Sequence, residues 1–274
     1  MRKVISIIIL AVILFSGICP AQSLPDGNLA HTYSVVAHDA VTGEMGVAIQ
    51  SHWFSVGSIV SWAESGAGAI ATQSFVNVSF GPRGLDLLKE GNSAEEVLQS
   101  LIASDEGRDF RQLAIVDSEG RVAVYTGKKC IAEAGHIKGD NFSVQANMML
   151  NNTVWHAMAE AYKDNFDEPL AERLIAVLEA AQAEGGDIRG RQSAALLVVK
   201  GESTGKPWED RLVDLRVDDN SHPVKELKRL LKLFRAYEHM NAGDVAIENN
   251  NIEKALYEYK TAEMMFPSNL EMKY

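Results

Sequence analysis

The sequence is poor in cysteine and proline, with 2 and 7 in 274 residues, and it has no surplus of basic residues. With 26 Lys and Arg against 37 Asp and Glu, the formal net charge is -11. This balance argues against nucleic acid as a partner, because binding to phosphates needs a basic face. The 46% of hydrophobic residues exclude a disordered chain, and the length suits one main domain with a small appendage.

Familiar catalytic signatures are missing as well. There is no phosphate-binding loop, no G-x-S-x-G turn, no H-E-x-x-H and no Cys/His spacing for zinc. The seven histidines are scattered singly, and we interpret His38, His52 and His136 as satisfied strand-end or surface residues rather than bases. We therefore expect no metal and no cofactor.

The first residues have the pattern of a secretory signal peptide. Arg2 and Lys3 precede an apolar run over residues 4–18, and small residues follow. The run is shorter than the roughly 18–20 residues that span a bilayer. We expect cleavage after Ala21 or Ser23 and export to the periplasm or the medium.

The two cysteines have different interpretations. Cys19 would suggest a lipoprotein, but Ile18 stands where lipidation favours a small residue, so this is the second choice. Removing the leader leaves Cys130 alone and excludes an intrachain disulfide. We interpret Cys130 as a buried small hydrophobic residue rather than a nucleophile.

Periodicity predicts a mixture of hairpins and helix pairs. Strands are expected over residues 33–38, 44–50, 66–77, 113–116, 122–126, 141–150, 192–200 and 211–217. Helices are expected as a pair within residues 79–105 and over residues 153–162 and 170–183. Hairpins favour antiparallel sheets and helix pairs can cover two outer faces, so the sequence predicts an α+β fold with four layers, helix, sheet, sheet and helix.

The chain changes character after residue 222, where a helical tail begins. Five of its positions have the relative spacings of a tetratricopeptide repeat: Gly243, Ala255, Tyr259, Ala262 and Pro267. A single repeat cannot bury its own apolar face. A plain helical hairpin that packs on the main domain is therefore an equally good interpretation.

Thr32 opens the first predicted strand and is the main candidate for chemistry. A threonine hydroxyl is a poor nucleophile unless a base removes its proton. An N-terminal threonine has such a base in its own α-amine, whose reference pKa is about 7.7–8.0. Thr32 suits this role if it becomes the first residue of the mature chain.

Five stretches carry a resemblance to a known family: "TYSVVAHDAVTGEMGVAIQSHWFSVGSIVSWAESGAGAIATQSFVN", "SFGPRGLDLLKEG", "GRDFRQLAIVD", "SVQANMM" and "EGGDIRGRQSAALLVV". From Thr32 to Asp219 the chain resembles the uncharacterised domain of unknown function 1028 family, which is assigned to the Ntn-hydrolase superfamily. The resemblance implies the four-layer αββα fold of proteasome subunits and penicillin acylase. Some relatives carry a C-terminal region assigned to peptidoglycan binding, and the helical tail lies in the matching place.

This chain departs from the family pattern before Thr32. In most members the threonine follows the initiator methionine, whereas "LPDGNLAH" precedes Thr32 here even after leader cleavage. Either a second cleavage, between His31 and Thr32, exposes the amine, as in self-processing Ntn enzymes, or this catalytic scheme is not available.

Polar residues near the predicted strand ends are candidates for the rest of the site. Asn147 is a candidate oxyanion donor, as an asparagine is in some Ntn hydrolases, with a hydrogen-bonded strand-end residue as the alternative. Gln73, Ser74 and Asn77 are candidates to line the same cleft, with a turn as the alternative.

The loop "GGDIRGRQS" supplies the remaining candidates. Arg189 and Arg191 can hold a substrate carboxylate in a bidentate contact, and Asp187 and Gln192 flank them. An ion pair between Asp187 and an arginine that fixes the loop is the alternative.

Together these features predict an exported hydrolase that cleaves an amide bond, with cell-wall peptide as the suggested substrate class. The expected partners are an amide-containing small molecule or a peptidoglycan fragment, a protein bound by the tail, and a second copy of the chain. The alternative is a non-catalytic binding protein with the same fold. The predicted parts are a signal peptide (1–21), a prosegment (22–31), an Ntn-hydrolase-like domain (32–222) and the tail (223–274).

Overall fold

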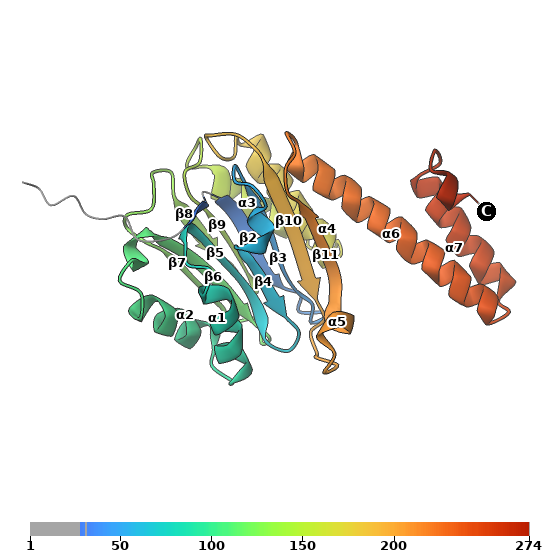
Figure 1. Ribbon diagram of the computed structural model, residues 1–274, viewed down its shortest axis with the longest axis horizontal. Helices are drawn as coiled ribbons and strands as arrows, with labels where there is room; N and C mark the ends of the chain where they lie inside the picture. The colour runs from blue at the N-terminus through green and yellow to red at the C-terminus, as the bar shows by residue number, and fades with distance from the viewer. Residues whose placement is uncertain (1–27, 31, 274) are drawn as a thin grey trace, which may run out of the picture.

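The computed structural model describes residues 28–30 and 32–273 (Figure 1). The predicted signal peptide and both of its candidate cleavage positions lie outside the described residues. Of the predicted prosegment, the structure describes the backbone of residues 28–30.

The larger sheet has six antiparallel strands in the order β11-β10-β3-β2-β9-β8. Its strands are β2 (Thr32–His38), β3 (Met45–Ser51), β8 (Gly135–Lys138), β9 (Phe142–Ala146), β10 (Ser193–Val199) and β11 (Arg211–Val217). In the β2–β3 hairpin, Thr32 lies opposite Ser51 and His38 lies opposite Met45. This hairpin lies at the centre of the sheet, so β2 has a neighbour on both sides.

The smaller sheet is also antiparallel and has five strands. These are β1 (Asn28–Ala30), β4 (Ser61–Glu64), β5 (Gly68–Val76), β6 (Arg111–Asp117) and β7 (Val122–Thr126). Both β1 and β4 pair with β5, at different places along it.

Helix pairs cover the outer faces of both sheets: α3 (Val154–Asp164) and α4 (Leu170–Ala183) on the larger sheet, α1 (Phe80–Lys89) and α2 (Ala94–Ala103) on the smaller one. The other helices in the described residues are the short α5 (Pro207–Asp210), α6 (Pro223–Glu248) and α7 (Ile252–Met265). Single 3-10 turns occur at Val56–Ser58, Arg108–Phe110 and Leu270–Met272. Ser93 and Glu96 form a capping box at the start of α2.

Three hydrophobic clusters follow from strand alternation. Tyr33, Val35 and Ala37 of β2 pack with α3 and α4, whereas Val36 packs between the two sheets with inward residues of β3, β5 and β10. The outward residues of β5 and β6 pack with α1 and α2. The side chains of β2 that share Val36's face therefore point between the sheets.

The described part of the chain has three strands that periodicity does not predict, and one predicted strand ends four residues early. β1, β4 and β8 have three or four residues each, too few to show an alternating pattern. The strand expected over residues 141–150 ends at Ala146 because Met148 adopts a left-handed backbone with φ 59.

The tail is a hairpin of α6 and α7 that extends away from the sheets (Figure 1). Gly243 allows close packing, because a Cβ there would lie 2.4 Å from the Tyr259 ring. Ala255 and Ala262 are buried. These contacts suit either a repeat unit or a plain hairpin, so the tetratricopeptide assignment stays a prediction. None of the helices in the described part of the chain is long and apolar enough to cross a membrane.

A buried ion pair joins the β2–β3 turn to α4. Arg173 Nη2 lies 2.9 Å from Asp39 Oδ2 and also donates to the carbonyls of Phe166 and Glu168. Burial opposes ionisation of Asp39, but the amides of Thr42 and Val41 and the Arg173 guanidinium together hold the pKa of that carboxyl below its ordinary value. The carboxylate therefore stabilises the fold at neutral pH.

Asp39→Asn should lower the free energy of unfolding by about 3 kcal/mol at pH 7, because it leaves a buried guanidinium without its counter-charge. The contribution of a carboxyl with a lowered pKa is present above its unfolded pKa of about 3.9 and is lost as pH falls through the folded pKa. The gap between variant and parent in urea unfolding should therefore shrink below about pH 4. Asp140→Asn, at an exposed position, is the control, and an equal loss there would contradict the assignment.

Candidate functional site

Thr32 begins β2 and is fully buried. It pairs with Ser51 of β3, which in turn pairs with Ser193 of β10, so three hydroxyl residues lie side by side across the sheet. Paired residues in an antiparallel sheet share a face, and this face is the one that points between the sheets. The predicted nucleophile thus lies at a strand end between the two sheets.

The Thr32 carbonyl is held by three donors. It accepts hydrogen bonds from Asn147 N at 3.1 Å, Asn147 Nδ2 at 3.4 Å and Gln73 Nε2 at 3.2 Å. Gln112 Oε1 accepts from the same two side-chain amides, at 2.6 Å from Gln73 and 2.9 Å from Asn147. Three amide side chains from three strands or strand ends therefore fix the position of Thr32.

The network continues behind these amides through fully buried groups. Ser34 Oγ donates to Gln73 Oε1 at 2.6 Å, Gln145 Nε2 donates to Ser34 Oγ at 2.7 Å, and Ser143 Oγ donates to Gln145 Oε1 at 2.9 Å. Buried networks whose members are satisfied are rigid, because breaking any bond leaves a desolvated polar atom. Thr32 is accordingly held by a preorganised polar layer.

The structure brings two predicted site residues, Asn147 and Gln73, to Thr32. Ser74 follows Gln73 on β5, is fully buried and has a left-handed backbone with φ 73. Asn77 does not join the network: its Oδ1 accepts from the amide and hydroxyl of Ser79 at the start of α1. Asn77 therefore has the turn role that was its alternative interpretation.

The loop at residues 187–192 is fixed by its own ion pair. Asp187 Oδ2 is buried and accepts from Arg189 Nη2 at 2.6 Å and from the His52 amide at 3.1 Å. The Gln192 amide donates to the Ser51 carbonyl at 3.1 Å. The loop thus lies beside Ser51, which pairs with Thr32. Arg189 forms the ion pair with Asp187 that was the alternative to substrate binding.

Arg191 lies on the helix-covered side of the larger sheet, opposite to the side that the Thr32 side chain faces. It is exposed and lines a cleft of about 320 Å³ with Gln182 and Lys225. Gln182 accepts from the Tyr33 hydroxyl at 3.2 Å, and Tyr33 packs on the helix-covered face. Burial raises the pKa of Tyr33 well above its ordinary value, although the charge of Arg191 opposes this. The structure does not bring Arg191 together with Thr32.

Cys130 is half-buried and free. Its Sγ lies 3.3 Å from the Arg111 carbonyl, and burial raises the pKa of its thiol. A protonated thiol is a weak nucleophile, which agrees with the interpretation of Cys130 as a packing residue.

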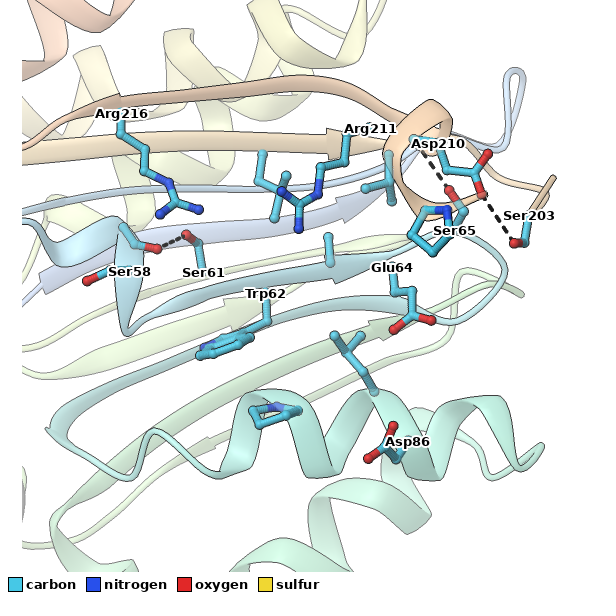
Figure 2. A pocket seen from close by; sticks show the side chains of 17 residues that line it. Ser58, Ser61, Trp62, Glu64, Ser65, Asp86, Ser203, Asp210, Arg211 and Arg216 are labelled. Atoms are coloured by element: carbon cyan, nitrogen blue, oxygen red, sulfur yellow. Dashed lines mark hydrogen bonds between the residues drawn. The ribbon is translucent and has the colours of Figure 1, made fainter. Parts of the chain in front are cut away.

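A separate cavity of about 360 Å³ lies where β11, the edge strand of the larger sheet, faces β4 of the smaller sheet (Figure 2). Arg211 and Arg216 of β11 point into it above Trp62 of β4, and both arginines pair with Asp214. Neither Thr32 nor the amide network lines it. Charged residues on the inner face of an edge strand discourage pairing with another chain, which accounts for these arginines without a ligand.

Four members of the network were not singled out from the sequence: Ser34, Gln112, Ser143 and Gln145. A signal for them exists, because each is a polar residue at an inward position of a mainly apolar strand; Gln112 differs in having Arg111 before it. These polar residues can be recognised as buried only when the inward face of each strand is known to be covered. A strand with one face in water shows the same alternation of polar and apolar residues. In the described part of the chain, no group of three His, Cys, Asp or Glu residues could hold a metal ion.

Fold and site together define an α+β protein with two antiparallel sheets and a buried threonine at a strand end between them. The model of the "Family of unknown function (DUF1028)" matches residues 32–227, so the chain belongs to this family. The match begins at Thr32 itself.

A solved structure from the same family agrees with this membership. The crystal structure of protein SPO2555 from Silicibacter pomeroyi, from the same family, is 31% identical with a TM-score of 0.66, covering 74% of this chain and 88% of that chain. Anbu (ancestral beta-subunit) from Yersinia bercovieri is 10% identical with a TM-score of only 0.35, covering 74% and 96%. None of the curated proteins matches the chain.

Proposed function

We propose that this protein is an N-terminal-nucleophile hydrolase that cleaves an amide bond, with Thr32 as the nucleophile. The observation that carries the proposal is the placement of Thr32: it starts a central strand, is buried between two sheets, and its carbonyl is held by Gln73 and Asn147. The two sheets with helix pairs on their outer faces support a four-layer Ntn-hydrolase-like architecture.

The first reaction in this proposal is removal of the prosegment. Thr32 Oγ1 adds to the His31 carbonyl carbon, the bond from that carbon to the Thr32 nitrogen breaks, and the nitrogen takes up the hydroxyl proton. This gives an ester and a free α-amine. Water then hydrolyses the ester, which leaves a carboxyl group on His31 and restores the Thr32 hydroxyl.

The second reaction is turnover of an external amide. The free α-amine accepts the Oγ1 proton, Oγ1 attacks the substrate carbonyl, and the protonated amine returns that proton to the leaving nitrogen. Water hydrolyses the resulting ester with the amine again as base. Asn147 is the proposed oxyanion donor: its Nδ2 would exchange its long, 3.4 Å hydrogen bond to the Thr32 carbonyl for one to the oxyanion and keep the bond to Gln112.

The remaining parts of the proposal rest on the sequence. Export would follow from the leader pattern before residue 22, and a wall-peptide substrate and a partner-binding tail from the resemblance. Of the proposed substrate-binding residues, Asp187, Arg189 and Gln192 lie in the loop that adjoins Ser51, next to Thr32 in the sheet. That loop is the proposed rim of the site, whereas Asn77 and Arg191 have no part in it.

The start of the mature chain tests the proposal. N-terminal sequencing and intact-mass measurement of protein recovered from its native compartment should find a species that begins at Thr32. A chain that begins only at Gln22 or Leu24 would keep the amine in a peptide bond and contradict the mechanism. It would favour a binding protein that holds a small molecule or wall fragment.

A further inference from the structure

One edge of β5 is divided between two short strands. β6 pairs with the opposite edge over residues 68–74, while on the divided edge β4 covers residues 68–71 and β1 covers residues 74–76. In β1, Asn28, Leu29 and Ala30 lie opposite Val76, Phe75 and Ser74, respectively. Thr32, two residues after Ala30, begins β2 in the other sheet. The segment on β5 thus leads directly into the bond before Thr32.

Asn28–Ala30 belongs to the acyl side of the His31–Thr32 bond. In the proposed first reaction, this segment is part of the acyl group that is transferred to Thr32 Oγ1. During the transfer the segment is paired antiparallel with β5. The position of Oγ1 is fixed by β2, so a later carbonyl must approach it by a similar path. Once residues up to His31 leave, the edge at residues 74–76 loses its partner strand, and an extended peptide can restore the ladder.

The edge is supported from behind, so it keeps its shape when β1 leaves. Arg111 is buried, donates through Nη1 to the Phe75 carbonyl, and pairs with Asp105 at 2.7 Å. The Phe75 ring packs edge-on against Phe110 with centroids 5.5 Å apart. These contacts come from β6 and the turn before it rather than from β1.

Ser74 marks the point where the edge passes from β4 to β1. Its hydroxyl is buried and interacts with the Cys130 thiol, and it has no oxygen or nitrogen partner among the described residues. Its left-handed backbone, φ 73, is uncommon for a residue other than glycine, and such strain is concentrated at binding sites. A thiol is a weak hydrogen-bonding partner, so a buried hydroxyl that has only a thiol beside it favours a ligand that supplies a stronger one.

We propose that the edge of β5 from Ser74 to Val76 is the acyl-side binding site of the mature enzyme, and that its substrate is an extended peptide held there by main-chain hydrogen bonds. This inference rests on the proposed function and narrows its substrate from any amide to a peptide with several residues before the scissile bond. The chain's own Asn28–His31 is the first such peptide.

The test uses the full chain after incubation, with its mass measured first, and coumarin amides as substrates. Acetyl-Asn-Leu-Ala-His-aminomethylcoumarin should have a kcat/KM at least about tenfold above that of acetyl-His-aminomethylcoumarin, because only the longer probe reaches residues 74–76. Two matched probes carry a single N-methyl group, on Leu or on Ala. Alternate amides of a strand face its partner, so one methyl group should lower kcat/KM about fivefold or more and the other should change it little.

The outcomes separate the two proposals. A chain that stays intact at His31 keeps β1 on β5 and overturns both the proposed function and this inference. A chain that is cleaved and hydrolyses both probes equally, or tolerates both N-methyl groups equally, keeps the hydrolase but overturns the strand site. Hydrogen exchange gives an independent readout: amides of residues 74–76 should lose protection on cleavage and regain it with acetyl-Asn-Leu-Ala-His-amide. No regained protection contradicts the inference.

Discussion

Thr32→Ala is expected to leave the bond between His31 and residue 32 intact and to abolish amide hydrolysis. Alanine has no hydroxyl to attack the carbonyl, so neither the prosegment ester nor the substrate ester can form. The chain should still fold, because the bonds from Gln73 and Asn147 go to the Thr32 carbonyl, which alanine retains. Intact mass before and after incubation, with circular dichroism as the check on folding, measures both effects.

Matched variants make this prediction specific. Thr32→Ser keeps a hydroxyl and should cleave itself, at a lower rate, since it lacks the methyl group that restricts the rotamer of threonine. Ser58→Ala, at an exposed serine in the cavity of Figure 2, should process like the parent. Cleavage of Thr32→Ala at the parental rate would assign the processing to another peptidase, and parental turnover would remove Thr32 from the mechanism.

The central hairpin and the helix pairs could be predicted because their periodicity is long and regular. β2, β3, β10 and α4 begin and end within one residue of the expected ranges. β1 could not be predicted in this way, because a three-residue strand is defined by its partner β5 rather than by its own pattern. The family resemblance identified Thr32, but the reason that a threonine can be held there emerges only when β5, β6 and β9 come together.

The candidate site shows the same limit. Asn147 and Gln73 were expected near Thr32, but Gln112 lies 39 and 35 residues away from them and meets them only in the folded sheets. Arg189 and Asp187, two residues apart, form a local pair that competes with any role in substrate binding. Arg191, two residues further on, lies on the other face of the sheet, which a loop's sequence does not indicate.

Gln112→Leu is expected to lower the free energy of unfolding by about 3–5 kcal/mol and to slow self-cleavage. Gln112 Oε1 is an acceptor for both Gln73 and Asn147, and its Nε2 donates to the Ala146 carbonyl at 3.0 Å and to Thr126 Oγ1 at 2.8 Å. Leucine has a similar size but no polar atom, so several buried groups lose a partner at roughly 1–3 kcal/mol each. Urea unfolding measures the loss, and Gln99→Leu on the exposed face of α2 is the control.

The coupling between the two glutamines shows whether the loss comes from the network or from packing. If Gln112 acts through Gln73, the double variant with Gln73→Leu should cost less than the sum of the single variants by about 1 kcal/mol or more. Additive costs would mean that the two amides act separately and that the network does not hold Thr32 as a unit. Self-cleavage measured where each variant is still fully folded then separates positioning from stability. Slow cleavage in a folded Gln112→Leu chain is the result expected if this buried amide aligns Thr32 with the His31 carbonyl.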